Sequence, residues 1–474
     1  MKNTAYDVPL FRGLCEFSAM NPISFHVPGH KNGTVFPDFA KATFGPLLSI
    51  DFTELTGLDD LHAPTEIIKE AQTRAATFFH ADETFFLVGG TTVGNLATIL
   101  AMCRPGEKLI VQRNSHKSIA NGLELAGATP IFLNPMFDSQ TDRYIAPSIE
   151  GLAKALQAHP DAKGVVLTYP DYYGKTYALK ELIDCAHAYQ IPVLVDEAHG
   201  VHFALGDPFP PSALQLGADV VVQSAHKMAP AMTMASWLHI KSDFVTRDQI
   251  QYYLSMLQSS SPSYPLLASL DIARAFLASL TKQDLTRILQ SAQQLKEDFA
   301  ESTHWFVEET SDPLKITLTM KQGHSGYEVA ALFEQEGIYP ELASHKHILF
   351  IHGLGELMRL DEVKLALKRI GQRLKISSNH ATIDISGLFQ KSYAQLAYTY
   401  NEMRMLPTKR MRLEQSIDYI AAEAIIPYPP GIPLVLKGER ITNRHAKLVE
   451  ALIKKGATFQ NQYIQTGILV FEEK

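Results

Sequence analysis

Five short apolar segments between about residues 66 and 240 constrain the fold of this chain more than any other feature. They are TFFLV (84–88), KLIVQ (108–112), GVVLT (164–168), PVLVD (192–196) and ADVVVQS (218–224). Each is bounded by Gly, Pro or Asp and is almost wholly apolar, which is typical of a strand buried on both faces. Amphipathic helical stretches separate the segments, and such alternation produces right-handed crossovers. We therefore predict an α/β fold with a mainly parallel central sheet flanked by helices.

The length of the chain predicts more than one domain. It has 474 residues, of which 46% are hydrophobic and 20% charged, a balance typical of a folded globular protein. Residues 1–50 have no clear period and are expected to form an arm that packs on something else. We predict a large domain over 51–300 and a smaller α+β C-terminal region over 301–474.

Two segments near the C-terminal region have patterns of their own. The polar segment 286–300 is expected to be helical, and PLKITLTM, from about residue 313, is expected to begin a second strand-and-helix region. PYPPGIP (427–433) is predicted to be neither helix nor central strand, because proline lacks an amide donor and fixes its own torsion.

Charge and cysteine content exclude several classes of protein. The net charge of -7 comes from 43 basic and 50 acidic residues, mixed along the chain, so bulk charge does not favour nucleic acid. Three scattered cysteines are too few for a disulfide framework and form no zinc-binding pair. The N-terminal MKNTAYDVPLFRGL lacks the apolar segment of a signal peptide, and no stretch resembles a membrane span. We expect a cytoplasmic protein with no membrane partner.

In sheets of this kind, ligands bind beyond the carboxyl ends of the strands. After TFFLV comes GGTTVGN (89–95), followed by a helical stretch. Glycine allows close approach to a ligand, and hydroxyl groups and a helix N-terminus donate hydrogen bonds to an anion. Gly90, Thr91 and Thr92 are therefore candidates for binding a phosphate, although a purely structural turn fits this segment equally well. It is neither a Walker A loop nor a dinucleotide fingerprint.

The segment PVLVD ends in a carboxylate, the first residue of Asp196-Glu197-Ala198-His199-Gly200. An acid at the end of a buried strand is costly unless it meets a cation or donors. A protonated pyridine nitrogen is such a cation, and an ionised Asp196 facing it would keep the ring able to accept electrons. The alternative is an ordinary helix N-cap.

A lysine follows ADVVVQ, in Ser224-Ala225-His226-Lys227. A lysine at the end of a buried strand is rarely tolerated unless it is paired or reactive, and a pyridoxal phosphate (PLP) enzyme needs such an amine. Ser224 and His226 are placed to bind the same phosphate as Thr91 and Thr92. A loop lysine pointing to solvent is the alternative.

His116 follows KLIVQ, in the segment RNSHKS (113–118). Its ring could stack on a planar group, although a surface histidine is equally compatible with this segment alone. Together, however, the strand ends offer a phosphate site, a stacking group, an acid and an amine. This combination predicts a PLP site.

The chain resembles the PLP-dependent ornithine, lysine and arginine decarboxylases of the aspartate-aminotransferase fold (fold type I), nearly end to end. It is most similar to short bacterial members, which lack the N-terminal response-regulator-like domain of the long forms. The resemblance rests on FHVPGHKNG (25–33), DFTELTGLDDLHAP (51–64), GGTTVGN (89–95), RNSHKS (113–118), TYPDYYG (168–174), LVDEAHGVHF (194–203), QSAHK (223–227), QSSSPSYPLLASLD (258–271) and AAEAIIPYPPGIPL (421–434).

The resemblance implies a role for each candidate. Lys227 would form the Schiff base with PLP and Asp196 would hold the pyridine nitrogen. The other cofactor-binding residues would be Gly90, Thr91, Thr92, His116, Ala198, His199, Ser224 and His226, with His116 and Ala198 on the two faces of the ring. The resemblance also implies a homodimer, or a higher oligomer, with active sites at the interface. Ser260 or Ser261 of the neighbouring subunit would then contact the phosphate. Glu423, Asp59 and Asp60 are the candidates for contacting the substrate.

Two departures from the family pattern leave substrate preference open. Pro170-Asp171 stands where many relatives have a small residue followed by Thr, and His199 stands where some long forms have Trp. Both positions are expected near the cofactor.

We therefore expect a PLP-dependent decarboxylase of lysine, arginine or ornithine that releases carbon dioxide and an amine. Lys227 or His226 would return the proton to Cα, and the sequence does not choose between them or between the substrates. One alternative is another fold type I reaction such as aminotransfer, which needs an arginine for the substrate carboxylate. A metallohydrolase using Asp196, His199, His202 and His226 is a further alternative. A helicase is disfavoured, because no Walker A loop accompanies Asp-Glu-Ala-His.

Overall fold

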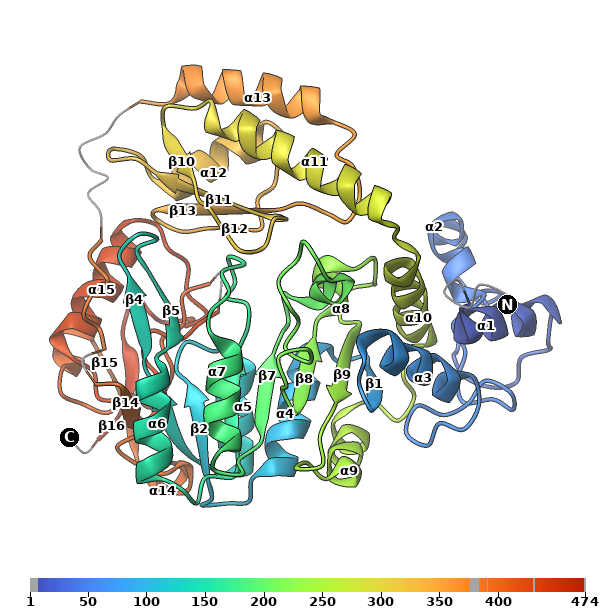
Figure 1. Cartoon of the computed structure of the whole chain (residues 1–474), viewed down its shortest axis with the longest axis horizontal. Helices are drawn as coiled ribbons and strands as arrows, with labels where there is room; N and C mark the ends of the chain where they lie inside the picture. The colour runs from blue at the N-terminus through green and yellow to red at the C-terminus, as the bar shows by residue number, and fades with distance from the viewer. Residues whose placement is uncertain (1–6, 376–382, 390, 429–430, 473–474) are drawn as a thin grey trace. The chain divides into compact units, whose positions relative to one another are not determined.

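The computed structural model describes residues 7–375, 383–389, 391–428 and 431–472. The chain, coloured by residue number in Figure 1, contains the helices and strands described below. It forms two compact units, each built from separate stretches of sequence. Unit 1 comprises Met1–Met102 and Gln190–Thr281, and unit 2 comprises Cys103–Tyr189 and Lys282–Lys474. The domains predicted from the sequence are continuous segments of the chain, unlike these two units, and their bounds stay a prediction. Pro429 and Pro430 of the PYPPGIP segment lie outside the described residues.

Unit 1 contains one sheet with the strand order β1 (Glu83–Leu87), β9 (Ser236–Ile240), β8 (Val220–Gln223) and β7 (Val193–Asp196). β7 and β8 are parallel, whereas β9 is antiparallel to both of its neighbours, β8 and β1. The three strands predicted from the sequence therefore run in one direction. β9 was not predicted, although its sequence SWLHI is buried throughout. β9 lies between β1 and β8 in the sheet.

Helix α4 (Gly90–Met102) follows β1 and packs closely on this sheet. A Cβ at Gly94 would lie 2.7 Å from Val222 Cγ1 and 2.8 Å from Leu87 Cδ1, so no larger residue fits there. The glycine brings the first turn of α4 close to the ends of the strands. The other helices of unit 1 include α3 (Ile67–Phe79), α8 (Ala225–Met228), α9 (Arg247–Leu257) and α10 (Tyr264–Ser279).

The N-terminal segment, expected to lack periodic structure, contains two helices, α1 (Pro9–Ala19) and α2 (Asp38–Leu48). In α1, Leu10 and Leu14 are one helical turn apart and both are fully buried, because this helix contacts α3 and α10. Buried Asp271 accepts a hydrogen bond from the amide of Leu10 at 3.0 Å. Between the helices, Phe25 is 94% exposed. The segment is therefore anchored at α1 and carries exposed apolar side chains beyond it.

Unit 2 contains the strand order β6 (Val165–Thr168), β2 (Lys108–Gln112), β3 (Thr129–Leu133) and β14 (Tyr393–Gln395). β6, β2 and β3 are parallel, and β14 is antiparallel to β3. The strands predicted at 108–112 and 164–168 are confirmed here, the second one residue shorter. Helices α5 (Lys117–Ala126), α6 (Ile149–Ala158) and α7 (Leu179–His187) and the hairpin of β4 (Pro135–Asp138) and β5 (Arg143–Pro147) complete this region.

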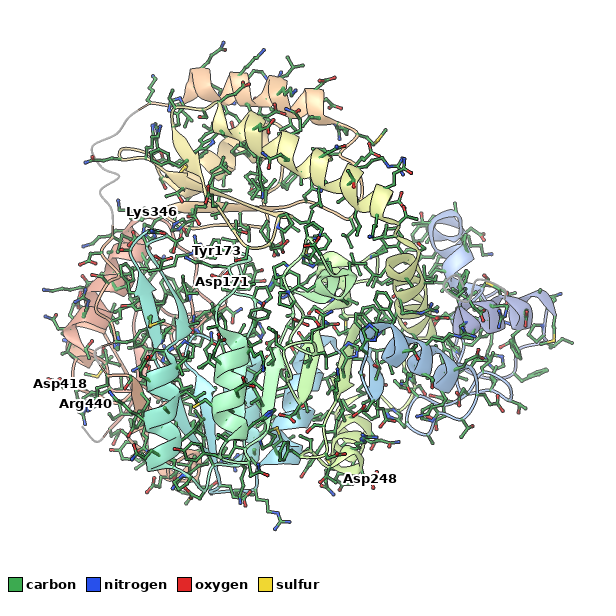
Figure 2. The ribbon with its side chains drawn as sticks, in the orientation of Figure 1. Asp171, Tyr173, Asp248, Lys346, Asp418 and Arg440 are labelled. Atoms are coloured by element: carbon green, nitrogen blue, oxygen red, sulfur yellow. The ribbon has the colours of Figure 1, made fainter. Side chains whose placement is uncertain are left out.

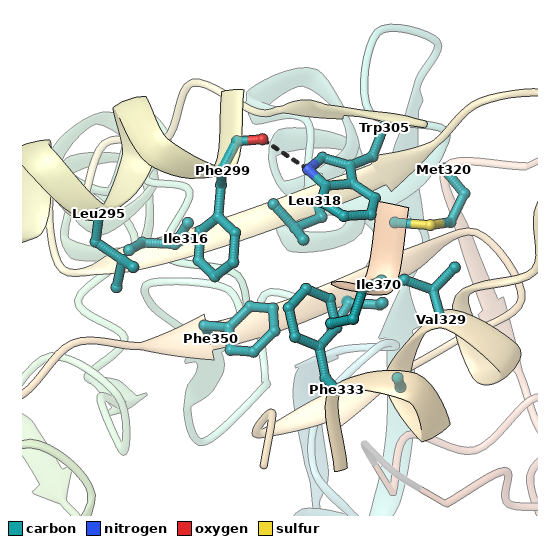
Figure 3. Close-up of a cluster of buried hydrophobic side chains, with 12 residues drawn as sticks. Leu295, Phe299, Trp305, Ile316, Leu318, Met320, Val329, Phe333, Phe350 and Ile370 are labelled. Atoms are coloured by element: carbon teal, nitrogen blue, oxygen red, sulfur yellow. Dashed lines mark hydrogen bonds between the residues drawn. The ribbon is translucent and has the colours of Figure 1, made fainter. Parts of the chain in front are cut away.

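A second sheet in unit 2 has the order β10 (Trp305–Val307), β11 (Lys315–Met320), β13 (His347–Ile351) and β12 (Leu342–Ala343). Its core includes Phe299, Trp305, Phe333 and Phe350, and Trp305 donates a hydrogen bond from Nε1 to the carbonyl of Phe299 at 2.9 Å (Figure 3). Helices α11 (Lys282–Ala300), α12 (Gly326–Gln335) and α13 (Leu360–Arg373) also contribute residues to this core. The predicted helix over 286–300 and the predicted strand in PLKITLTM are confirmed.

The last part of unit 2 has a small core around a two-stranded sheet of β15 (Thr408–Met411) and β16 (Ile468–Phe471). It also contains α14 (Tyr400–Met405) and α15 (Asn443–Lys454). Within the described ranges of the chain, no helix combines the length and the apolar composition needed to cross a membrane.

Candidate active site

Asp196 ends strand β7 and is 3% exposed. Its Oδ2 accepts a hydrogen bond from Nδ2 of Asn95 at 3.0 Å, and its Oδ1 accepts one from the amide of Ala198 at 3.2 Å. Asn95 lies in α4 and is fully buried, so the carboxylate is held by the helix and by its own loop. In the described part of the chain, no Lys or Arg forms an ion pair with Asp196. A protonated pyridine nitrogen would supply the missing positive charge.

Lys227 lies in the short helix α8, directly after β8, which is the parallel neighbour of β7. Its Nζ lies 2.9 Å from Nε2 of His199. The structure therefore brings the predicted amine, the predicted acid and His199 to adjacent strand ends within one unit. His199, one of the two departures from the family pattern, contacts the lysine directly.

The candidate phosphate site lies at the start of α4. Oγ1 of Thr91 and Oγ of Ser224 are 3.1 Å apart, although 133 residues separate them in the sequence. Gly90 has a φ of +74°, and a Cβ built on it would meet nothing within 4 Å. Thr92 is exposed in the same first turn. Two hydroxyl groups, an open backbone and helix N-terminal amides form a donor set that suits a phosphate ester.

A hydrogen bond to a backbone carbonyl orients the ring of His226. Its Nδ1 lies 3.1 Å from the carbonyl oxygen of Ala235, so Nδ1 carries a proton that it donates to this oxygen. This bond fixes the orientation of the His226 ring. Lys227 is the next residue in the chain. Together with Asp196, Thr91 and Ser224, the residues of unit 1 fit PLP in charge and in donor chemistry.

A buried polar network links the strands behind this site, and sequence reasoning missed it. Glu197 accepts hydrogen bonds from the amide of Ala213 at 2.7 Å and from Nε2 of Gln223 at 2.6 Å. Oε1 of Gln223 lies 3.0 Å from Nε2 of His239, whose Nδ1 lies 2.8 Å from Oγ1 of Thr84. Burial raises the pKa of Glu197 to about 8 and lowers the pKa of His239 to about 3. Glu197 thus ties the end of β7 to the end of β8.

His116, the predicted stacking residue, belongs to unit 2 and is the N-cap of α5. Its Nδ1 accepts a hydrogen bond from the amide of Ser118 at 3.2 Å. A Cβ at Gly431 would lie at ordinary contact distances from two rings, 3.9 Å from Cδ2 of His116 and 3.6 Å from Cδ2 of Tyr428, and the φ of +87° is what favours glycine there. Stacking of His116 on a cofactor stays a prediction.

The predicted substrate carboxylates are already engaged in the fold. Asp59 accepts hydrogen bonds from the amides of Thr65, Glu66, Ile68 and Lys69, at or just before the start of α3. Burial opposes its ionisation, but these bonds together outweigh burial and lower its pKa. Its acceptor sites are thus used within the chain, and this geometry favours a structural role over substrate contact. Asp60 accepts a bond from the amide of His62 at 2.8 Å.

Glu423 has two partners of its own. Its Oε1 lies 3.3 Å from Nη1 of Arg410 and accepts a hydrogen bond from the amide of Leu469 at 2.7 Å. An arginine already balances its charge, so a second cation would gain less from this carboxylate. A role in substrate binding stays a prediction for Glu423, Asp59 and Asp60.

The remaining expectations concern two exposed serines and the alternative metal site. Ser260 and Ser261 are exposed between α9 and α10, where contact with a neighbouring subunit stays a prediction. The alternative metal site needed Asp196 and three histidines to converge. Across the residues that the structure describes, no group of three or more His, Cys, Asp or Glu side chains is arranged to hold a metal ion.

Comparisons with known proteins identify the family to which the chain is similar. The family model described as "Orn/Lys/Arg decarboxylase, major domain" matches residues 8–312, and the model of its C-terminal domain matches residues 385–463. An uncharacterized protein of Bacillus subtilis, YaaO, is 45% identical over 94% of both chains. The arginine decarboxylase of the same organism is 36% identical over 96% of this chain and 95% of its own.

Solved structures extend the likeness to the fold. The constitutive lysine decarboxylase of Escherichia coli superposes with a TM-score of 0.80 at 20% identity, over 98% of this chain and 82% of its own. A serine palmitoyltransferase structure with PLP has a TM-score of 0.53 at 18% identity, over 70% of this chain and 83% of its own. The fold is thus the fold type I architecture of PLP-dependent enzymes, and the chain belongs to the Orn/Lys/Arg decarboxylase family.

Proposed function

We propose that this protein is a PLP-dependent decarboxylase whose substrate is lysine, arginine or ornithine. The observation that carries the proposal is the position of Asp196 and Lys227, which lie at the ends of the adjacent parallel strands β7 and β8. Asp196 is buried there with two hydrogen-bond donors and no cation among the described residues. A relative that is 36% identical is named arginine decarboxylase, and another that is 25% identical is named a lysine decarboxylase.

Bound PLP would supply an electron sink for breaking the bond between Cα and the carboxylate. The chain's own residues would bind the cofactor and return a proton to the substrate. Asp196 would accept a hydrogen bond from the protonated pyridine nitrogen, and Asn95 and the amide of Ala198 hold its carboxylate in place. Thr91 and Ser224, whose hydroxyl oxygens lie 3.1 Å apart, would donate hydrogen bonds to the phosphate. The amine of Lys227 or the ring of His226, adjacent residues of the short helix α8, would return a proton to Cα.

The direct experiment offers lysine, arginine, ornithine and shorter diamino acids to the PLP-loaded enzyme and identifies the products. We expect carbon dioxide and the corresponding amine from at least one of them. Keto-acid formation without carbon dioxide would show aminotransfer instead. No amine from any of these substrates would contradict the decarboxylase proposal.

A second experiment tests the cofactor attachment separately. Wild-type protein should bind PLP with a visible absorbance that borohydride bleaches, because the cofactor is linked to an amine of the chain. Lys227→Ala should lose this property, whereas Lys241→Ala, which removes an exposed lysine of the same unit, should keep it. Covalent PLP in Lys227→Ala at the wild-type level would contradict the assignment of Lys227.

We also propose that the chain acts as a homodimer with its active sites at the interface, as the family resemblance implies. Exposed apolar side chains in unit 1 support this proposal, among them Ile23 at 85%, Phe25 at 94% and Phe39 at 92% exposure. Side chains of this kind are typical of surfaces that another protein covers.

A further inference from the structure

Strand β1 ends at Leu87 and leads into residues 88–92, the phosphate loop, which contains the candidate phosphate-binding residues. β1 stands first in the strand order of its sheet, so in the described part of the chain one of its edges is not paired with another strand. Such an edge presents backbone amides and carbonyls that need other partners. Val88 is 8% exposed and lies just beyond the last residue of β1, so its amide needs a partner within the protein.

The side chain of Gln258 supplies this partner. Its Oε1 accepts a hydrogen bond from the amide of Val88 at 2.9 Å, and its Nε2 donates a longer one to the carbonyl of Phe86 at 3.5 Å. One side-chain amide thus binds both a donor and an acceptor at the end of β1, as the backbone of a neighbouring strand would. The contact joins residues 170 positions apart in the sequence.

The backbone around Gln258 is held by contacts of its own. Gln258 is the C-cap of α9, and its amide donates a hydrogen bond to the carbonyl of Leu254 at 3.0 Å. Asp248, labelled in Figure 2, lies in the first turn of this helix, which packs against α4. The carbonyl of Ser259 accepts a hydrogen bond from Nε2 of His62 at 2.8 Å. The fold therefore sets the position from which the Gln258 side chain reaches β1.

A second contact holds the other end of the phosphate loop. The amide of Gly90 donates a hydrogen bond to the carbonyl of Met234 at 2.9 Å. The carbonyl of the next residue, Ala235, accepts the bond that orients His226. The loop is thus held at Gly90 by backbone and at Val88 by a side chain, and a substitution can remove the second contact.

We propose that Gln258 is a positioning residue for the phosphate group of PLP. It holds the phosphate loop in the conformation that presents Gly90 and Thr91 to the cofactor. The proposal rests on the function proposed above and deepens it. Without Gln258 the empty loop would populate other conformations, and the apparent affinity for the phosphate group would fall in proportion to the competent fraction. Asp196 and Lys227, which follow β7 and β8, would bind the rest of the cofactor as before.

The test compares the binding of PLP with that of pyridoxal, which lacks the phosphate group. Both are titrated, by visible absorbance, into full-length protein freed of cofactor. Gln258→Met keeps the length of the side chain, but a thioether accepts hydrogen bonds only weakly. We expect the Kd for PLP to rise about tenfold, as for the loss of one hydrogen bond to a buried amide. The Kd for pyridoxal should change by less than about twofold on the same reasoning.

A control variant and a second measurement separate positioning from a general loss of structure. Gln249→Met makes the same change at an exposed position of α9 and should bind both aldehydes as wild type does. Hydrogen exchange needs no cofactor. In Gln258→Met the amides of the phosphate loop should exchange about tenfold faster than in wild type, whereas the amides of β7 and β8 should keep their rates.

Wild-type affinity for PLP in Gln258→Met would overturn the proposal, and so would an equal loss of affinity for PLP and pyridoxal. If Gln258→Met does not fold, Gln258→Asn decides by the same comparison, because its side chain is one methylene shorter and does not reach Val88. Wild-type affinity for PLP in that variant would then overturn the proposal.

Failure of the proposed function gives a different result. If the protein binds PLP but is not a decarboxylase, wild type produces no amine from any basic amino acid. The comparison of PLP with pyridoxal still decides the role of Gln258 in that case. A wild-type protein that binds neither aldehyde would contradict the proposed function and the role of Gln258 together.

Discussion

Glu197, the residue after Asp196, is expected to change its charge near neutral pH. It is fully buried, and its carboxylate receives two hydrogen bonds but no cation among the described residues. Burial therefore raises its pKa from the ordinary 4.5 to about 8. At pH 7 the neutral form would be favoured about tenfold in the folded protein, whereas in the unfolded chain the group would be ionised.

The sign of the effect on stability follows from this difference. Between pH 4.5 and about 8 the folded state retains a proton that the unfolded state has lost. The free energy of unfolding therefore decreases by about 1.4 kcal/mol per pH unit across this window, and this contribution becomes constant above it. Integrated from pH 6 to pH 8, the loss of stability is about 2 kcal/mol.

The assay is urea unfolding of wild type and Glu197→Gln at pH 6 and pH 8. Other titrating groups are common to both proteins, so their contributions cancel in the difference between the two unfolding free energies. Wild type should lose about 2 kcal/mol relative to the variant between these pH values. Infrared spectroscopy should show a protonated carboxyl band that disappears as the pH passes about 8, and this band should be absent from the variant.

Glu181→Gln is the matched control, because Glu181 is exposed on α7. Its stability difference from wild type should be the same at both pH values. If the difference between wild type and Glu197→Gln is also independent of pH, the reasoning is refuted and Glu197 is ionised throughout.

Two further predictions follow from buried hydrogen bonds in unit 1. Asn95→Ala should raise the Kd for PLP about tenfold, because a hydrogen bond to a charged group is lost and Asp196 is held less firmly; an unchanged Kd in a cofactor titration would contradict this. Asp271→Ala should lower the unfolding free energy by about 3–5 kcal/mol, since Arg274, 3% exposed, would lose its ion-pair partner. Asp284→Ala, which breaks an exposed pair with Arg287 on α11, should cost less than about 1 kcal/mol in the same urea measurement.

The buried strands and the charged residues at their ends could be predicted from the sequence alone. The apolar runs predicted β1, β2, β6, β7 and β8 to within a few residues, because strands buried on both faces need nearly continuous apolar sequence. Asp196 and Lys227 were identified for a related reason. A charged side chain at the end of such a run is costly unless something compensates it, so its presence is informative.

Contacts between segments that are distant in the sequence could not be predicted. SWLHI is as apolar as the predicted strands, but only the folded sheet shows that β9 runs antiparallel between β1 and β8. The N-terminal helix α1 is stable because Leu10 and Leu14 pack in unit 1 and Asp271 binds its first turn. Tertiary contacts, which short-range patterns do not encode, decide both features.

The same limit applies to the acidic residues. Asp59, Asp60, Glu197, Glu341 and Glu423 are chemically alike in the sequence, and a carboxylate's role depends on its partners. Folding places backbone amides around Asp59, an arginine beside Glu423, an uncharged buried network around Glu197 and a single phenol beside Glu341. The residues predicted a PLP site, and the resemblance of the sequence identified the decarboxylase family. The tertiary structure decided which carboxylates are occupied, because occupancy depends on groups up to 169 residues apart in the sequence.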